Sequence, residues 1–171
     1  MIRPILIHPD PRLKKVASPV ADVTDQLRKL ADDMLETMYD APGIGLAGPQ
    51  IGVSSRIFVM DCADKEEDPD PIVMLNPEIV ARSDELSPYE EGCLSIPDIY
   101  AEVTRPAEVT MRWLDLDGNE RQADFGGLRA TCAQHELDHL DGKLFIDYLG
   151  SVKRMTITNK MKKLKKARAA G

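Results

Sequence analysis

The segment that decides the architecture of this chain is 127–140, Gly-Leu-Arg-Ala-Thr-Cys-Ala-Gln-His-Glu-Leu-Asp-His-Leu. It holds two of the protein's three histidines, His135 and His139, four residues apart. Residues at this spacing lie on one face of an α-helix, so both imidazoles can reach one metal ion. Gly142 is placed to end such a helix. The segment therefore predicts a helix that binds a metal, with the rest of the chain packed around it.

Glu136 follows His135 directly, which places it about 100° further around the helix. This position suits a base beside the ion better than a ligand. The alternative is that two histidines and a glutamate share a solvated face by chance. Because two of only three histidines occupy the motif, the metal hypothesis is favoured. The chemistry it predicts is metal-dependent hydrolysis with Glu136 as proton carrier.

Two imidazoles leave the site incomplete, and the third ligand decides the class of enzyme. One group of metallopeptidases uses the pattern His-Glu-x-x-His-x-x-Gly-x-x-His; Gly142 matches it, but Phe145 stands where the third histidine is required. Another group uses a downstream glutamate, and no Glu follows His139 in this chain. Asp141 and Asp147 lie too close to His139 for that geometry. The third ligand is therefore expected upstream.

Three cysteines are the upstream candidates to weigh. Cys93 is the best, because Gly92 before it permits close backbone approach and a thiolate is a strong ligand for a borderline metal. Cys132 is weaker, since it lies on the helical face of His135 and more readily lines a pocket beside the ion. Cys62 ends an apolar strand and is most simply a buried thiol. An odd number of cysteines argues against a disulfide framework.

The first half of the chain predicts an extended arm and one helix. Prolines punctuate residues 1–20, so at most a short helix is expected there. A helix follows from Thr24, a plausible N-cap, to the stop at Pro42 and Gly43. Its predicted apolar face consists of Leu27, Leu30, Ala31, Met34, Leu35 and Met38. The segment 43–52 is so rich in glycine that a loop without regular structure is expected.

The strand signals favour an α+β fold. Strands are expected at 56–60, 72–75 and 78–82, and a hairpin at 107–116 and 120–125 turns at Asp117 and Gly118. The order lacks the βαβα alternation of a parallel sheet. We therefore expect small antiparallel or mixed sheets around the metal-binding helix, with one N-terminal and one C-terminal helix. The length predicts one domain over 1–171.

Charge is distributed very unevenly along the chain. The net charge is −7, yet residues 151–171 carry eight Lys or Arg and no acid, which leaves −15 on the rest. A basic amphipathic helix is expected at about 151–168, with either a solubilising role or an anionic partner of its own. The overall charge makes DNA a poor default partner, and no apolar run is long enough to span a membrane. The short apolar start predicts no export signal and a cytoplasmic location.

Three segments together resemble the bacterial-type peptide deformylase family. They are Gly43-Ile44-Gly45-Leu46-Ala47-Gly48-Pro49-Gln50, then Glu91-Gly92-Cys93-Leu94-Ser95, then Gln134-His135-Glu136-Leu137-Asp138-His139. The similarity continues through residues 142–149. The resemblance implies an enzyme that removes the formyl group from the N-terminal formylmethionine of new polypeptides and releases formate. The similarity covers nearly the whole chain.

The resemblance also implies a role for each residue of the three segments. Cys93, His135 and His139 would bind the metal, and Glu136 would take a proton from water and later give it to the departing amine. The Gln50 side-chain amide and the Leu94 backbone N–H would stabilise the developing oxyanion. The expected substrate pocket consists of Ile44, Gly45, Tyr89, Leu128 and Cys132, with the peptide backbone pairing near Ile44 and Gly45.

The metal and the partners follow from the same resemblance. It implies Fe²⁺ in the cell, while one thiolate and two imidazoles also suit Zn²⁺, Ni²⁺ or Co²⁺. Nascent formylated polypeptides are the expected substrates. For the basic tail, attraction to ribosomal RNA is the functional alternative to a purely solubilising helix. The chain departs from the family at Gly48, where Ala is usual, and at Ile99-Tyr100, where many members carry an Arg. The second departure, at Ile99-Tyr100, would affect how longer peptides fit the site.

Overall fold

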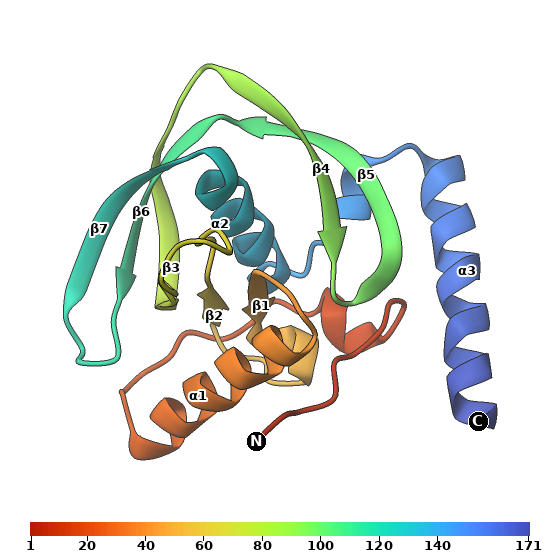
Figure 1. Cartoon of the computed structure of the whole chain (residues 1–171), viewed down its shortest axis with the longest axis horizontal. Coiled ribbons are helices and arrows are strands. Elements are labelled where there is room, and N and C mark those ends of the chain that lie inside the picture. Colours follow the sequence, from red (N-terminus) through yellow and green to blue (C-terminus); the bar gives the residue numbers. More distant parts are fainter.

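The computed structural model describes residues Met1–Gly171 and confirms the α+β fold (Figure 1). The helices are α1 (Asp25–Asp40), α2 (Gly127–Leu140) and α3 (Ser151–Ala170), with 3₁₀-helices η1 (Pro11–Lys14), η2 (Gly48–Ile51) and η3 (Phe145–Tyr148). The strands are β1 (Gly45–Ala47), β2 (Ile57–Met60), β3 (Ile72–Arg82), β4 (Leu86–Cys93), β5 (Ile96–Pro106), β6 (Glu108–Leu114) and β7 (Glu120–Gly126).

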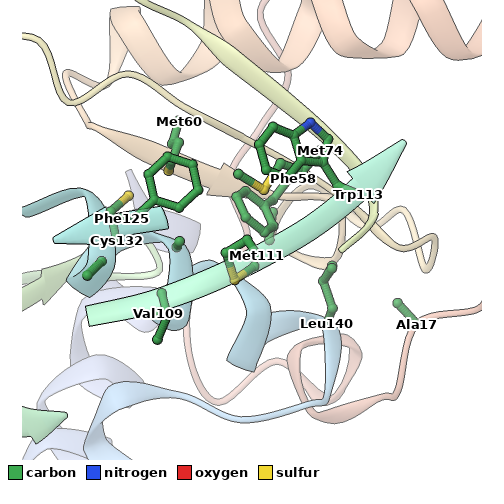
Figure 2. Close-up of a cluster of buried hydrophobic side chains, with 13 residues drawn as sticks. Ala17, Phe58, Met60, Met74, Val109, Met111, Trp113, Phe125, Cys132 and Leu140 are labelled. Carbon is green, nitrogen blue, oxygen red and sulfur yellow. The ribbon is translucent and has the colours of Figure 1, made fainter. Parts of the chain in front are cut away.

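Helix α2 lies in the middle of the molecule, between two antiparallel sheets (Figure 1). One sheet has five strands in the order β1-β2-β3-β6-β7, and the other is the β4–β5 hairpin. The inner side chains of the five-stranded sheet pack against α2 in a buried cluster that includes Phe58, Met111, Phe125 and Cys132 (Figure 2). This arrangement buries α2 on two sides and so holds its histidines away from solvent.

Helix α1 forms as its sequence predicts. The Thr24 side chain accepts a hydrogen bond from the backbone N–H of Leu27 at 3.2 Å, which caps the first turn. Its buried face packs on β1, β2 and β3 in a second cluster that includes Leu30, Met34 and Leu75. The helix ends before Pro42, which cannot continue it. The predicted start, stop and apolar face are confirmed.

Two expectations about the strands were wrong. The glycine-rich segment is not a loop, because Gly45–Ala47 pairs with β2 and Gly48–Ile51 forms η2. Small residues permit this, since a Cβ on Gly48 would lie 2.8 Å from the carbonyl oxygen of Val53. The segments 72–75 and 78–82 form one strand, β3, which bends through bulges and the positive φ of Asn76 instead of ending.

The β4–β5 hairpin was not anticipated from the sequence. Leu86–Cys93 pairs with Ile96–Pro106, and the turn between them carries Leu94 and Ser95. Strand β4 is mostly exposed, and apolar and polar residues do not alternate along it. A period of two residues therefore did not reveal the hairpin. The hairpin at β6 and β7 and the helix α2 are confirmed.

Helix α3 lies at one side of the molecule, next to the hairpin and the N-terminal arm (Figure 1). It contributes Ile157 and Met161 to a third buried cluster, together with Ile7 and Phe145. Thr158 Oγ1 accepts a hydrogen bond at 2.8 Å from Nε2 of His8, because its own hydrogen is donated to the carbonyl of Arg154. The expected C-terminal helix is therefore docked on the body. None of the helices is both long and apolar enough to cross a membrane.

Candidate metal centre

Three side chains converge where α2 passes the β4–β5 turn. Cys93 is the last residue of β4, while His135 and His139 project from one face of α2. The Cys93 Sγ lies 3.4 Å from Nε2 of His139, and the two Nε2 atoms of the histidines are 3.3 Å apart. All three donor atoms lie within 4.8 Å of one another. The three donors thus face a single point.

This donor set fits a divalent transition metal. Tetrahedral coordination with bonds of about 2.0–2.3 Å places ligand atoms about 3.3–3.8 Å apart, and the separations to His139 lie in or close to that range. Both histidines are buried and Cys93 is half-buried, so the ion would be shielded from most of the solvent. One thiolate and two imidazoles suit several first-row metals. Only three protein ligands are present, which is typical of a catalytic and not a structural site.

A buried carboxylate fixes the orientation of His135. Its Nδ1 hydrogen-bonds to Oε1 of Glu91 at 3.0 Å, which leaves Nε2 to face the other two donors. Glu91 accepts two further bonds from Arg105, at 2.7 and 3.0 Å. Burial raises the pKa of Glu91, but the bonds from His135 and Arg105 outweigh that effect and the net pKa is lowered. Glu91 is therefore an anion that increases the basicity of the ligand it contacts.

The network extends from Arg105 toward the surface. Nη1 of Arg105 donates to Oδ2 of Asp138 at 2.8 Å, and the Tyr148 hydroxyl donates to the same oxygen at 2.7 Å. The Arg105 guanidinium also stacks over the Tyr148 ring at 4.9 Å. These contacts join β5, α2 and η3 around the ligand His135. Every charge in the network has a partner, which is the condition for a buried ion pair to be tolerated.

Glu136 is a buried carboxyl group next to the three donors. Its side chain is buried, and Oε1 has no hydrogen-bond partner. Oε2 lies 4.0 Å from Nε2 of His135. Burial raises the pKa of Glu136 to about 7, partly opposed by the positive charge that His135 can carry. A carboxylate with such a pKa can both take and return a proton near neutral pH.

The Gln50 amide is held in one orientation on the wall of the site. Its Oε1 accepts a hydrogen bond from the Ala47 backbone N–H at 2.9 Å, so Nε2 points toward the metal ligands. Nε2 lies 3.1 Å from Ser95 Oγ and 3.6 Å from Cys93 Sγ. Both Gln50 and Ser95 are buried. A donor fixed in this way can be directed at an oxyanion without rearrangement.

A single cavity opens onto these groups. Of the residues expected at the site, its walls include Ile44, Gly45, Gln50, Tyr89, Cys93, Leu94, His135 and Glu136. His139 is completely buried behind them. Cys132 does not line the cavity and lies behind Gly45, where its Sγ would be 2.8 Å from an added Cβ. Leu128 is half-buried and also lies outside the lining. Cys62 is half-buried, not buried as expected.

The two departures from the family pattern have structural correlates. Gly48 faces the backbone of Val53 and Ser55, with no room for a Cβ unless one of them moves. Tyr100 is 66% exposed and lines the same cavity, and its ring covers the backbone of Gly92, where an added Cβ would lie 2.6 Å from it. An aromatic side chain thus lines the cavity in the region where the resemblance led us to expect an Arg.

Sequence reasoning missed four residues of this site: Ser95, Glu91, Asp138 and Arg105. The first three stand inside the quoted motifs, so their proximity to the ligands was a usable signal. Arg105 had none, because it lies 12 residues beyond Cys93 on a strand whose pairing only the tertiary structure reveals.

A family model described as polypeptide deformylase matches residues 2–155 of the chain. Among curated relatives, the peptide deformylase of Rhizobium meliloti is 53% identical over 169 residues, covering 99% of this chain and 97% of the relative. The peptide deformylase of Mesorhizobium japonicum is 55% identical over 170 residues, with the same coverage of both chains.

Solved structures give the same result. A peptide deformylase from Legionella pneumophila superposes with a TM-score of 0.91 at 47% identity, covering 100% of this chain and 99% of that one. A peptide deformylase from Ehrlichia chaffeensis superposes with a TM-score of 0.94 at 38% identity, covering 99% of both chains. The similarity therefore extends over both sheets, α2 and the metal centre.

Proposed function

The chain belongs to the polypeptide deformylase family, and from this premise we propose how its residues remove the N-formyl group from newly made polypeptides. It is a metal-dependent hydrolase whose substrates are formylated nascent chains. The observation that carries the assignment of roles is the unpaired Oε1 of Glu136, which is buried in the cavity wall beside the Cys93, His135 and His139 donors.

Cys93, His135 and His139 would hold the metal. When bound, the ion would act as a Lewis acid toward the formyl carbonyl and would increase the acidity of water at the site. Fe²⁺ is the ion we propose for the cell, and Zn²⁺, Ni²⁺ or Co²⁺ would occupy the same donors in its absence. The mixed thiolate and imidazole set supports this range. Glu91 would keep His135 in the tautomer that leaves Nε2 free to bind.

Glu136 would move the protons of the reaction. Its raised pKa of about 7 allows it to take a proton from water and return it to the departing amine of the peptide. The buried Oε1, which has no hydrogen-bond partner, supports this role, since it is not committed to another group. The Gln50 amide and the Leu94 backbone N–H would donate to the oxygen on which negative charge develops. The bond from Ala47 keeps the Gln50 donor directed into the cavity.

The substrate would be held by the wall around Gly45. Strand β1 pairs with β2 on one side only, so its other edge is free to receive an extended peptide. Ile44 and Tyr89 are both partly exposed in the cavity and would contact the methionine side chain. Cys132 and Leu128 would support that pocket from behind Gly45 and along α2.

A formate-release assay with a formyl-Met peptide tests the assignment. The Glu136→Gln variant should retain the metal and lose about 10²–10⁴-fold in kcat, because the proton carrier is gone. Glu90→Gln is the matched control, since it removes a carboxylate that lines the same cavity but is exposed. Loss of activity in both variants alike, or metal loss in Glu136→Gln, would contradict the base role.

The ligand assignment is tested by metal analysis of protein purified without oxygen. Cys93→Ala should lose most of its metal, whereas Cys62→Ala, at a half-buried thiol outside the donor set, should keep a full complement. Iron as the main ion in protein handled this way would support the cellular assignment. Equal metal content in the two variants would refute the role of Cys93.

We also propose that the basic helix α3 attracts ribosomal RNA, which places the enzyme in the cytoplasm beside its nascent substrates. Most of its cations are exposed, among them Lys153, Lys162 and Lys163. Lys162→Glu with Lys163→Glu should weaken co-sedimentation with ribosomes at low salt without unfolding α3. Unchanged co-sedimentation would refute the contact. The control is the variant Glu66→Lys with Glu67→Lys, which reverses two charges in the acidic loop between β2 and β3.

A further inference from the structure

The cavity at the metal centre extends well beyond the catalytic groups. Its volume of about 760 Å³ is in the range of pockets that enclose a drug-sized ligand and exceeds what one terminal residue requires. Four exposed residues outside the metal centre are among those that line the cavity: Ile2 of the N-terminal arm, Asp40 at the end of α1, Tyr100 of β5 and Arg168 near the end of α3. The C-terminal helix therefore borders the substrate cavity.

The docking of α3 determines where Arg168 lies. Ile157, Met161 and Leu164 pack on the body in the third cluster. Arg168 follows Leu164 by four residues and so continues the same helical face by one more turn. The end of α3 and the N-terminus lie on the same side of the molecule (Figure 1). Arg168 therefore stands on a different face of α3 from Lys166, which lies two residues away and about 200° around the helix.

Arg168 is the one cation in the cavity lining that is neither part of the metal centre nor engaged in an ion pair. Arg3, the other arginine, is bound to Asp33 at 2.9 Å. The exposed carboxylates of Asp40, Glu90 and Asp98 also line the cavity and make no ion pair. An acidic residue of a substrate that entered this part of the cavity would meet repulsion from them. Arg168 is the group that can offset that repulsion.

We propose that Arg168 is a specificity-determining residue that contacts the substrate chain downstream of the formylated methionine. An extended peptide advances about 3.3 Å per residue, so the residues that follow a formylmethionine held at the metal centre would extend along the cavity that Arg168 also lines. The guanidinium offers donors for a carboxylate there and favours substrates with Asp or Glu at these positions. The cationic helix α3 in this way contributes to substrate selection with its last turn.

The effect should appear in binding and not in the chemical step. A partly exposed ion pair contributes little, about 0.2–1 kcal/mol, which corresponds to about 1.4- to 5-fold in affinity. Arg168 lies outside the group of residues that touch the reacting atoms. Its removal should therefore change KM for acidic substrates and leave kcat the same.

The test uses pairs of amidated peptides, formyl-Met-Ala-Ala-Glu and formyl-Met-Ala-Ala-Lys, with formate release by full-length enzyme of equal metal content. The measured quantity is the ratio of kcat/KM for the Glu peptide over the Lys peptide. Arg168→Gln should lower this ratio about 1.4- to 5-fold, and Arg168→Glu should lower it further, through KM. The difference in this ratio between wild type and the Arg168 variants should shrink as salt is raised from about 20 to 500 mM. Moving the Glu through positions two to five locates the contact.

Lys166→Glu is the matched control, because it makes the same change of charge in the same turn of α3 on the opposite face. An unchanged ratio in Arg168→Glu with Glu at every position would overturn the proposal. An equal shift in Lys166→Glu and Arg168→Glu would also overturn it, since the net charge of α3 and not the place of Arg168 would then be responsible. The inference rests on the deformylase activity; no formate from any peptide with wild-type enzyme would contradict that activity instead.

Discussion

Gly45 of β1 packs against the carboxylate of Glu136, the base that we propose. A Cβ there would lie 2.5 Å from Oε2 of Glu136 and 2.8 Å from Sγ of Cys132. Neither neighbour can withdraw easily, because both belong to the buried helix α2. The glycine is needed here for close approach and not for an unusual backbone conformation.

We therefore expect Gly45→Ala to lower kcat/KM by about 10²-fold or more, because Glu136 must leave its place. The metal should stay bound, since the three atoms nearest to the added Cβ belong to Glu136 and Cys132 and not to the metal ligands. Formate release and metal content are the measurements. Gly150→Ala is the control, as a Cβ at Gly150 meets nothing within 4 Å. Wild-type kinetics in Gly45→Ala would contradict the close packing described for the site.

At the scale of elements, η1 depends on an acidic cap. The Asp10 side chain accepts a hydrogen bond from the Arg12 backbone at 2.9 Å and forms an ion pair with its guanidinium at 2.8 Å. The bond from Arg12 lowers the pKa of Asp10 to about 2, against the opposing effect of partial burial. Because the folded pKa is depressed, this stabilisation is complete above about pH 4 and is lost as the pH falls through about 2.

Asp10→Asn should accordingly reduce stability at pH 7 by about 0.5–1 kcal/mol, since Arg12 is more than half exposed and the pair is screened. The difference from wild type should narrow as the pH falls from 4 to 2. Urea unfolding at a series of pH values measures it. Asp84→Asn, at an exposed carboxylate without an ion pair, should show no such trend. A difference that does not vary with pH would refute the role of the charge.

The β4–β5 hairpin contains the buried pair of Arg105 and Glu91, and each member also bonds to α2, Glu91 to His135 and Arg105 to Asp138. Only 6% of the Arg105 side chain and 3% of the Glu91 side chain are exposed. Removing one member leaves the other as an uncompensated buried charge, which costs far more than the pair contributes. The hairpin carries Cys93, so the pair also maintains the distance between that thiol and the histidines.

Arg105→Gln should destabilise the fold by about 3–5 kcal/mol and weaken metal binding by about 10- to 100-fold, because Glu91 loses its partner and His135 its support. Arg112→Gln provides the comparison, since Arg112 forms exposed pairs with Glu78 and Glu120 and should cost less than about 1 kcal/mol. Chemical unfolding and metal titration measure the two effects. Similar losses in both variants would contradict the importance of burial.

At the scale of the whole molecule, the third cluster joins segments that are distant in the sequence. Ile7 of the N-terminal arm, Val103 of the hairpin, Phe145 of η3 and Met161 of α3 pack together. This cluster seats α3, whose eight positive charges would otherwise belong to a separate, solvated helix. The docked position is what brings the end of α3 to the substrate cavity.

Met161→Ala should reduce the free energy of unfolding by about 2–4 kcal/mol, because a buried side chain of this size leaves a cavity when truncated. Met155→Ala, six residues earlier on the same helix and 66% exposed, should change it by less than about 0.5 kcal/mol. Thermal and urea unfolding give the comparison. Equal effects at the two positions would show that α3 is not docked as described.

Local signals predicted the helices well, because caps and apolar periodicity act within a few residues. Thr24 and Pro42 bounded α1, and the motif at His135 predicted α2. The β4–β5 hairpin was not predicted, because the pairing of Leu86 with Pro106 is a contact between residues distant in the sequence and leaves no local pattern. The glycine-rich segment was misjudged for a related reason: its strand conformation depends on pairing with β2.

The sequence by itself determined the ligand chemistry of this protein: two imidazoles one helical turn apart, an adjacent Glu136, and a thiolate at Cys93 that the histidine motif required from upstream. Tertiary structure alone decided that Cys93 meets the histidines, that Arg105 and Glu91 hold His135 in its orientation, and that Arg168 reaches the substrate cavity. The physical reason is that residue type and helical spacing are local properties. Convergence of side chains from β4, β5, α2 and α3 depends on strand pairing and buried packing, which involve the whole chain.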